Sequence, residues 1–314
     1  MKWFATAPAN LALIKYMGKR DTQNNIPSNS SLSYTLDHLC SFVELELSSG
    51  TEDIWEPLEY PNCSLLDLTP PAIVRFLAHL SRLKKHFAFQ GNFIVRSAND
   101  FPPDCGLASS ASSFAALTKA GVTALSALTA MTIPDVTEQA RLSQLGSGSS
   151  CRSFFEPWAL WSGEKVMAVE LPYEKLLHMV VVVDAMTKKV SSSSAHQRVS
   201  SSSLFIGRGE RAEQRLEHLI HKLQVKEWEA ASVIVWQEFW DMHALFETAN
   251  PPFGYMTPDS LHVLQAVREV WLSQGDGPIA TMDAGPNVHL LFRPDQQHLF
   301  ENLKLFFAAD YQLI

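Results

Sequence analysis

The sequence predicts a mixed α/β protein, because segments with strand periodicity alternate with segments with helix periodicity before a long helical run and a late pair of strands. The 314 residues are 46% hydrophobic and 18% charged, which is typical of a folded protein with a substantial core. That length fits one large domain or two modest ones. We expect two lobes, residues 1–183 and 184–314, with the boundary near Asp184.

Strands and one helix are expected in the first hundred residues. Residues 42–47 (FVELEL) alternate apolar and charged, which predicts a strand with one buried face, and shorter strands are expected at 3–7 and 31–36. From Ile73 to Leu83 apolar residues recur at helical spacing, and Pro70-Pro71 suits the first turn of that helix.

The middle of the chain continues the alternation. We expect a strand at 93–96, a buried pair of helices within the small-residue stretch 106–134, a helix at 136–145, and strands at 166–171 and 176–185.

A helical run follows. Residues 210–223, 227–249 and 259–273 are its three expected helices. Serines dominate 190–194 and again 199–203, a composition that a flexible surface loop would explain.

Charge and cysteine usage exclude several classes of protein. With 25 basic and 33 acidic residues the net charge is −8, which argues against a nucleic-acid or anionic-membrane binder. The four cysteines form no CxxC pair, so neither a zinc ribbon nor a small disulfide framework is expected. We find no targeting segment and no stretch of about 20 predominantly apolar residues. A cytoplasmic protein is therefore expected.

The first candidate motif is a small-residue segment that leads into a helix. Residues 102–111 read PPDCGLASSA, and such a segment lets backbone amides approach a phosphate at a helix N-terminus. Its hydroxyls could also sit near magnesium. It is no Walker A loop, since the Gly-Lys-Ser/Thr ending is absent. Tight helix packing through small side chains is the structural alternative.

The second motif, residues 146–152 (GSGSSCR), supplies amide and hydroxyl donors together with Arg152. A guanidinium suits a carboxylate or a phosphate bidentately. Alone, the segment could also be a flexible turn. A serine hydrolase is disfavoured, because the chain contains no Gly-x-Ser-x-Gly elbow.

Two further motifs carry charge at the ends of apolar segments. Asp283, within residues 281–287 (TMDAGPN), could be a general base, although turn capping by Asp is the commoner use. Residues 7–20 bring Lys15, Lys19 and Arg20 into a small positive region, for which a solvated basic turn is the alternative.

Taken in their order along the chain, beginning with residues 7–20, the four motifs resemble those of the diphosphomevalonate decarboxylases of the GHMP small-molecule kinase superfamily. The likeness runs from Ala7 to Asn287, and residues 102–111 match the superfamily phosphate-loop pattern Pro-x-x-x-Gly-Leu-x-Ser-Ser-Ala in full. Residues 188–193 (KKVSSS) and 242–244 (MHA) add to it.

The resemblance implies an α+β, two-lobed GHMP kinase fold, with an N-terminal ribosomal protein S5 domain 2-like lobe and a C-terminal ferredoxin-like lobe. It also implies ATP and Mg²⁺, a homodimer, and conversion of (R)-5-diphosphomevalonate to isopentenyl diphosphate, ADP, phosphate and carbon dioxide. The alternatives are a phosphomevalonate decarboxylase, a sibling mevalonate-type kinase, or a non-catalytic ATP-binding regulatory protein.

The resemblance also implies residue roles. Asp283 is the base, Lys15 the cation beside it, and Arg152 the clamp on the substrate carboxylate. The ATP-binding residues are Gly106, Leu107, Ala108, Ser109 and Ser110, with Ser110 nearest the magnesium. The other substrate-binding residues are Asn10, Tyr16, Met17, Gly18, Lys19, Arg75, Ser147, Gly148, Ser149, Ser150, Cys151, Ser192 and Ser193.

The chain departs from the family pattern at several of these positions. Met17 stands where the family usually has tryptophan, and Ala195-His196 replaces Gly-Met after the serines. Asp104 puts a carboxylate in the phosphate loop, where a small neutral residue is usual.

Overall fold

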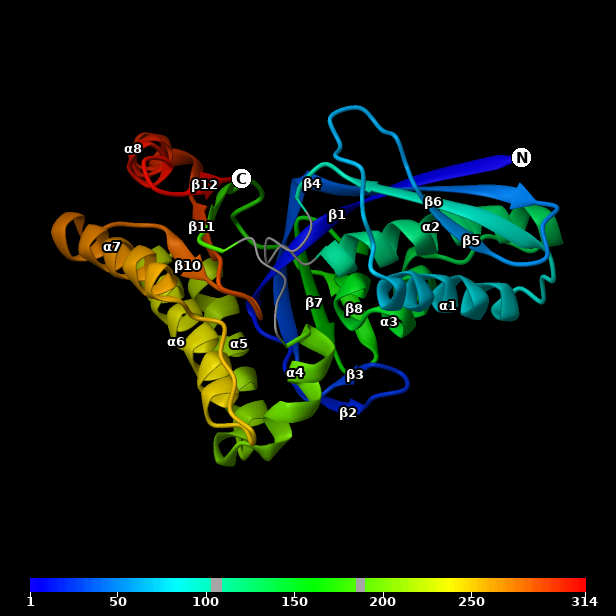
Figure 1. The fold of residues 1–314 in the computed structure, drawn as a ribbon. Helices are drawn as coiled ribbons and strands as arrows, with labels where there is room; N and C mark the ends of the chain where they lie inside the picture. Colours follow the sequence, from blue (N-terminus) through cyan, green and yellow to red (C-terminus); the bar gives the residue numbers. More distant parts are fainter. Residues whose placement is uncertain (103–108, 185–189) are drawn as a thin grey trace.

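The computed structural model describes residues 1–102, 109–184 and 190–314 and is built around two sheets (Figure 1). In the first sheet the strand order is β5-β6-β4-β7-β8, and β1 pairs with β4 along its other edge. Its strands are β1 (Lys2–Ile14), β4 (Ser31–Ser48), β5 (Ile54–Pro57), β6 (Asn92–Asn99), β7 (Trp158–Ser162) and β8 (Lys165–Ala168).

The two longest strands, β1 and β4, form the axis of this sheet. They run antiparallel from the Lys2–Glu46 pair to the Ile14–Leu32 pair, with register shifts after Pro8 and after Ala12. The first half of β1 alternates between more and less exposed residues, whereas its last eight residues are all buried. Strand β1 contacts α5 and α6, and buried residues of its second half lie in one apolar cluster with residues of these two helices, so β1 packs against the other lobe.

Three helices cover one face of the first sheet (Figure 1): α1 (Pro70–His86), α2 (Ser109–Thr129) and α3 (Val136–Gly146). Pro70 and Pro71 open α1, as predicted. The expected pair of helices within 106–134 is wrong, because α2 is one helix of 21 residues. Its small side chains allow close packing: a Cβ on Gly121 would lie 2.8 Å from Leu83 Cδ1.

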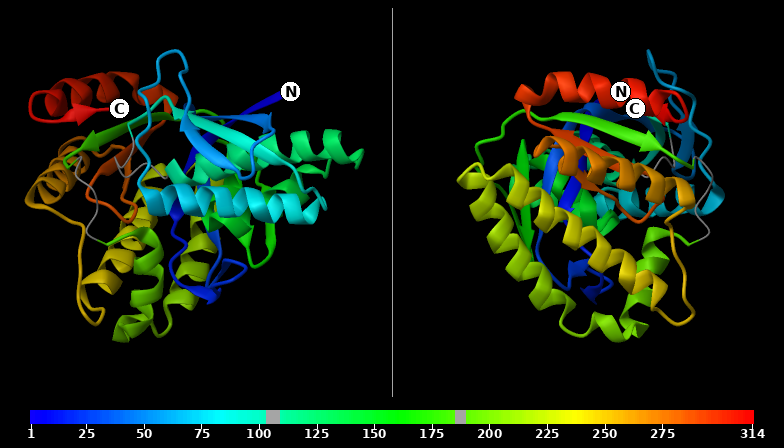
Figure 2. Two further views of the ribbon diagram at one scale, coloured as in Figure 1. Left: turned by 45° about the vertical axis from the view of Figure 1, so that its right-hand side comes forward. Right: turned by 90° about the vertical axis from the view of Figure 1, so that its left-hand side faces the viewer.

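The second sheet is antiparallel and has the order β10-β11-β9-β12. Figure 2, whose right-hand view looks onto this lobe, shows α6, α7 and α8 in the foreground. The elements are β9 (Leu177–Val182), β10 (Ile279–Thr281), β11 (Val288–Phe292), β12 (Gln312–Leu313), α5 (Arg208–Gln224), α6 (Trp228–Glu247), α7 (Pro258–Gln274) and α8 (Gln297–Ala308). The three expected helices of this region are confirmed as α5, α6 and α7.

The pairing of strand β9 indicates where the two lobes divide. It pairs with β11 and β12 of the second sheet, although it precedes residue 184. We therefore propose that the second lobe begins at β9. The expected strand at 166–171 is found as the shorter β8, and β7 before it was not predicted.

The serine-rich segment is not the flexible surface loop that its composition predicts. It forms α4 (Ser192–Arg198) and two short 3-10 turns, Val199–Ser201 and Ser203–Phe205. Ala195 and Val199, four residues apart, are both 0% exposed and pack with Met17 and Phe246. Burial of these two side chains fixes the segment despite its many serines.

The remaining elements are a small hairpin, β2 (Lys19–Asp21) with β3 (Ile26–Pro27), and the 3-10 helices η1 (Gly148–Phe154) and η4 (Pro294–Gln296). Across residues 1–102, 109–184 and 190–314, no helix combines the length and the apolar character needed to cross a membrane.

Candidate active site

Lys15 and Asp283 form an ion pair between the two lobes. Lys15 follows the last residue of β1, and Asp283 lies just beyond β10. Lys15 Nζ is 2.7 Å from Asp283 Oδ1, and the two side chains are 2% and 22% exposed. Two sequence-predicted residues 268 positions apart are thus in contact.

The surroundings of this pair favour proton transfer. Burial lowers the pKa of Lys15, the charges of Asp283 and Glu238 oppose that shift, and the charge of Arg152 adds to it. An ammonium at this distance stabilises the ionised form of a carboxylate, which is the form that a general base needs.

The turn that carries Asp283 is held from three sides. His243 Nε2 donates a hydrogen bond to the Asp283 carbonyl oxygen at 3.1 Å, and burial lowers the pKa of His243 to about 3. Ser260 Oγ donates to the Pro286 carbonyl at 2.6 Å. Asn287 Oδ1 accepts the Val183 N–H at 2.9 Å, which ties the turn to the end of β9.

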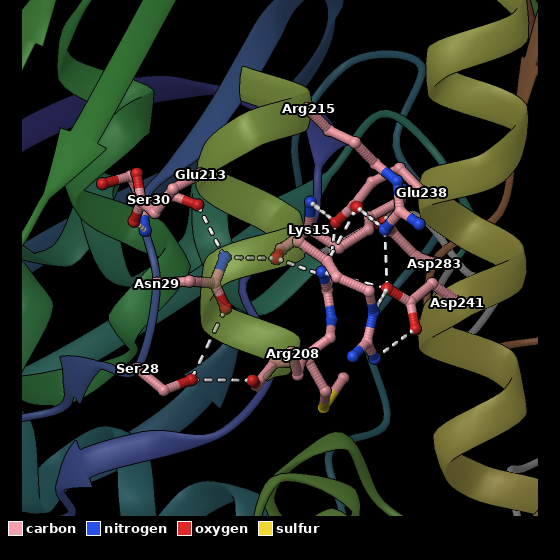
Figure 3. A network of polar contacts seen from close by, with 12 residues as sticks. Lys15, Ser28, Asn29, Ser30, Arg208, Glu213, Arg215, Glu238, Asp241 and Asp283 are labelled. Carbon is pink, nitrogen blue, oxygen red and sulfur yellow. Dashed lines mark hydrogen bonds and ion pairs between the residues drawn. The ribbon is translucent and has the colours of Figure 1, made fainter. Parts of the chain in front are cut away.

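The main chain of Lys15 is held by a buried ion pair from the second lobe (Figure 3). Its N–H donates to Glu238 Oε1 at 3.0 Å, and its carbonyl accepts from Arg208 Nη2 at 3.3 Å and from Asn29 Nδ2 at 3.0 Å. Arg208 of α5 and Glu238 of α6 pair with each other and are 1% and 0% exposed. Both polar groups of the Lys15 backbone therefore have partners although β1 has already ended.

Further charges complete this network. Arg215 Nη1 lies 3.0 Å from Glu238 Oε2 and 2.6 Å from Asp241 Oδ2, and Arg211 Nη2 lies 2.8 Å from Asp241 Oδ1. The sequence analysis missed this network. A signal was present in the sequence. Arginines spaced by three and four lie just before and within one predicted helix, and acids spaced by three lie on the next predicted helix.

Arg152, in η1, is a buried cation with neutral partners. Its side chain is 4% exposed, Nε donates to Asn10 Oδ1 at 3.1 Å, and Nη1 donates to Ser31 Oγ at 2.8 Å. Within the described ranges no carboxylate forms an ion pair with it. A buried charge is costly without an opposite one, so this guanidinium is suited to an incoming anion.

The predicted residue Asn10 fixes the orientation of Arg152. Its amide nitrogen donates to Ser153 Oγ at 2.8 Å and to the Ser149 carbonyl at 3.2 Å, which leaves Oδ1 facing Arg152. The Trp161 ring lies 5.8 Å from the guanidinium carbon.

Lys19 and Arg75 are two further cations, and Tyr16 carries an unpaired hydroxyl. The pKa of Lys19 is lowered by burial and then by the charge of Arg75, which places the two cations near each other. Burial also raises the pKa of Tyr16, and its hydroxyl has no hydrogen-bond partner among the described residues. Two repelling cations and an unpaired hydroxyl suit an anion with several oxygens.

The glycine-serine segment divides into half-buried and buried side chains. Ser147 and Ser149 are half-buried. In contrast, Ser150 Oγ lies 2.6 Å from both Ser143 Oγ and the Ser147 carbonyl. Cys151 is 0% exposed, and burial raises the pKa of its thiol to about 12. Ser150 and Cys151 thus hold the turn together, and their predicted substrate contacts stay predictions.

Gly148 brings the turn close to Tyr16, because a Cβ on it would lie 3.0 Å from Tyr16 Oη. Met17 is 2% exposed and lies in the apolar cluster beneath α4. Ser192 and Ser193 are exposed at the start of that helix.

The predicted ATP site is described in part. Ser109 and Ser110 are the first two residues of α2 and are half-buried, whereas Gly106, Leu107, Ala108 and the unusual Asp104 lie outside the described residues, as do Lys188 and Lys189. In the ranges that are described, no group of three or more His, Cys, Asp or Glu side chains could hold a metal. A hydroxyl at a helix start fits a phosphate-bound Mg²⁺ better than a metal held by protein alone.

Comparison with known proteins gives concordant matches. Residues 7–170 match a family model described as Diphosphomevalonate decarboxylase-like N-terminal domain, and residues 178–313 match Mevalonate 5-diphosphate decarboxylase C-terminal domain. The diphosphomevalonate decarboxylase of Debaryomyces hansenii is 30% identical over 317 residues, which cover 93% of this chain and 80% of that protein.

Solved structures agree. A mevalonate diphosphate decarboxylase from Legionella pneumophila is 51% identical, with a TM-score of 0.95 over 100% of both chains. A structure described as MDDEF in complex with MVAPP, AMPPCP and magnesium is 29% identical, with a TM-score of 0.88 over 100% of this chain and 95% of that one.

The buried network makes one prediction about stability. Glu238→Gln removes the charge opposite Arg208 and Arg215, and we expect the free energy of unfolding to fall by about 3 kcal/mol, because a buried cation loses its partner. Chemical denaturation measures this, with Glu217→Gln on the exposed face of α5 as the matched control. Equal stability of the two variants would contradict the role given to the pair.

Proposed function

The chain belongs to the diphosphomevalonate decarboxylase family, and we propose that it converts (R)-5-diphosphomevalonate and ATP to isopentenyl diphosphate, ADP, phosphate and carbon dioxide at the site formed by Lys15, Asp283 and Arg152. The observation that carries this proposal is the buried Arg152 with neutral partners, next to a lysine–carboxylate pair. The charge of Asp283 acts on Arg152 and the charge of Arg152 acts on Lys15, so the three groups share one electrostatic environment.

The first step is phosphoryl transfer. Asp283 takes the proton of the tertiary 3-hydroxyl, whose oxygen forms a bond to the γ-phosphorus of ATP as the bond to the β-phosphate oxygen breaks and ADP leaves. Lys15 orients Asp283 through the 2.7 Å contact and offsets negative charge on the transferred group.

The second step is elimination. The carbon–oxygen bond breaks and phosphate departs, because a phosphate is a far better leaving group than the hydroxyl that it replaced. Positive charge develops at that carbon and draws the electrons of the adjacent carboxylate bond, which gives carbon dioxide and the new double bond. Arg152 holds the carboxylate until it is lost, and its buried surroundings strengthen that contact.

The remaining roles divide between the two substrates. We assign the diphosphate to Tyr16, Lys19 and Arg75, whose charges and unpaired hydroxyl suit it. We assign further substrate contacts to the half-buried Ser147 and Ser149 and to the exposed Ser192 and Ser193 at the start of α4. Ser109 and Ser110 at the start of α2 receive the ATP phosphates, and Ser110 would hold Mg²⁺, which supplies charge neutralisation to the phosphoryl oxygens.

The cell compartment and assembly are also proposals. Cys40, Cys63 and Cys151 are free thiols, which suits a reducing cytoplasm. We keep the homodimer that the family resemblance implies.

Product analysis tests the reaction. The purified protein is incubated with ATP, Mg²⁺ and either mevalonate, its 5-phosphate or its 5-diphosphate, and ADP and carbon dioxide are followed together. We expect both in equal amounts with the diphosphate alone. ADP without carbon dioxide would identify a sibling kinase, preference for the monophosphate would identify the alternative decarboxylase, and no turnover would favour a binding protein.

Asp283→Asn tests the base. We expect turnover to fall roughly 100-fold to 10,000-fold, the range that general-base catalysis contributes, while ATP binding persists. Turnover is measured by ADP release and binding by calorimetry. A variant that retains wild-type turnover would remove Asp283 from the base role.

Arg152→Lys tests the clamp. A point charge cannot replace a bidentate guanidinium that also contacts Asn10 and Ser31, so we expect kcat/KM for the diphosphate to fall roughly 10-fold to 100-fold. Arg268→Lys on the exposed side of α7 is the control. Unchanged kinetics at Arg152 would mean that the carboxylate is held elsewhere.

A further inference from the structure

His196 is a half-buried side chain of α4 that the mechanism above does not use. Its ring lies against Tyr16, with centroids 4.2 Å apart, and its Nδ1 is 3.0 Å from the backbone nitrogen of Gly18. Tyr16 and Gly18, both among the predicted substrate-binding residues, therefore contact this imidazole.

The contact with Gly18 determines which nitrogen of His196 carries the proton. A backbone N–H can only donate, so Nδ1 accepts and the proton of the neutral ring is on Nε2. Burial, then the charges of Lys19 and Arg152, lower the pKa of His196 to about 3. The ring is therefore neutral at physiological pH, and protonation of Nδ1 would also break the bond to Gly18.

The position of the ring is fixed from both sides. Gly18 has a φ of +93°, and a Cβ there would lie 2.7 Å from the Phe205 ring and 2.9 Å from Ser28 Oγ, so only glycine presents its N–H in this way. On the other side, the buried Ala195 anchors α4 against Met17. Such a ring loses little freedom when it binds a ligand.

We propose that His196 binds the diphosphate of the substrate through its neutral Nε2–H, an inference that deepens the proposed function and rests on it. The residues that act on His196 electrostatically, Lys19 and Arg152, are the cations assigned to the anionic groups of the substrate. Among the described residues Nε2 has no acceptor, and an imidazole N–H is a good donor to a phosphate oxygen. A neutral donor adds a contact without a further positive charge among cations that already repel one another.

Two substitutions separate this role from packing. His196→Phe keeps a ring against Tyr16 but removes both nitrogens. His196→Gln keeps an acceptor for Gly18 and a donor for the ligand. For the phenylalanine variant we expect KM for 5-diphosphomevalonate to rise about 10-fold to 100-fold, as for a lost hydrogen bond to a charged group, with KM for ATP unchanged and kcat within about 2-fold. The glutamine variant restores most of the loss, and His221→Phe on the exposed face of α5 is the control.

Inorganic pyrophosphate gives a readout that is independent of turnover. Its affinity, measured by calorimetry, falls in the phenylalanine variant in the same proportion as the KM effect. Unchanged affinity and unchanged KM in that variant would overturn the proposal, as would a loss confined to kcat. If the wild-type protein releases no carbon dioxide from the diphosphate, the proposed function fails, while the pyrophosphate comparison still tests His196.

The pH dependence tests the neutral state of the ring. Because the neutral ring is the donor, KM for the diphosphate in the wild type and in His196→Gln follows the same profile between pH 6 and pH 8. If KM for the diphosphate decreases as the pH is lowered below 6.5 in the wild type alone, the imidazolium is the form that binds. That result would overturn the assignment of a neutral donor.

Discussion

The site depends on how the main chain of Lys15 is held after β1 has ended. Its N–H and carbonyl are bound by Glu238 and Arg208, which come from α6 and α5 of the second lobe (Figure 3). The residue that reaches Asp283 thus directly follows a strand of the first sheet but is positioned by helices of the other lobe. A buried ion pair adds little net stability over apolar packing, so its value here is the geometry that it imposes.

Two buried arginines show the difference between structural and ligand-binding charge. Arg208 is 1% exposed and is paired with Glu238, so its charge is satisfied within the protein. Arg152 is 4% exposed, yet its contacts are an amide oxygen, a hydroxyl and an indole ring. Both arginines are removed from water, but only Arg152 lacks an ion-pair partner within the described residues, so only Arg152 gains from an anionic ligand. Burial by itself does not distinguish them, whereas the chemistry of their partners does.

The sequence predicted what local pattern determines. Period-two alternation predicted the strand at 42–47, and helical spacing predicted α1 and the run from α5 to α7, all of which the structure confirms. It did not predict β7, or that α2 is a single helix, because a stretch rich in Ala, Ser and Gly has no period that marks where a helix ends. The serine-rich α4 was missed because two buried side chains decided its structure against composition.

The site was predictable to a similar degree. Motif order identified Lys15, Arg152 and Asp283, and the structure brings Lys15 and Asp283 into contact and links Arg152 to both by charge, whereas the catalytic roles remain predictions. The departures at Met17, Ala195 and His196 also prove to be neighbours. Met17 packs in one cluster with Ala195, and the next residue, Gly18, donates to His196. In a close-packed interior a change of side-chain volume is felt by whatever touches it, so changes at contacting positions are expected to occur together. We therefore interpret Met17, Ala195 and His196 as one repacked wall, in which the indole that the family usually carries is absent and an imidazole supplies the polar group.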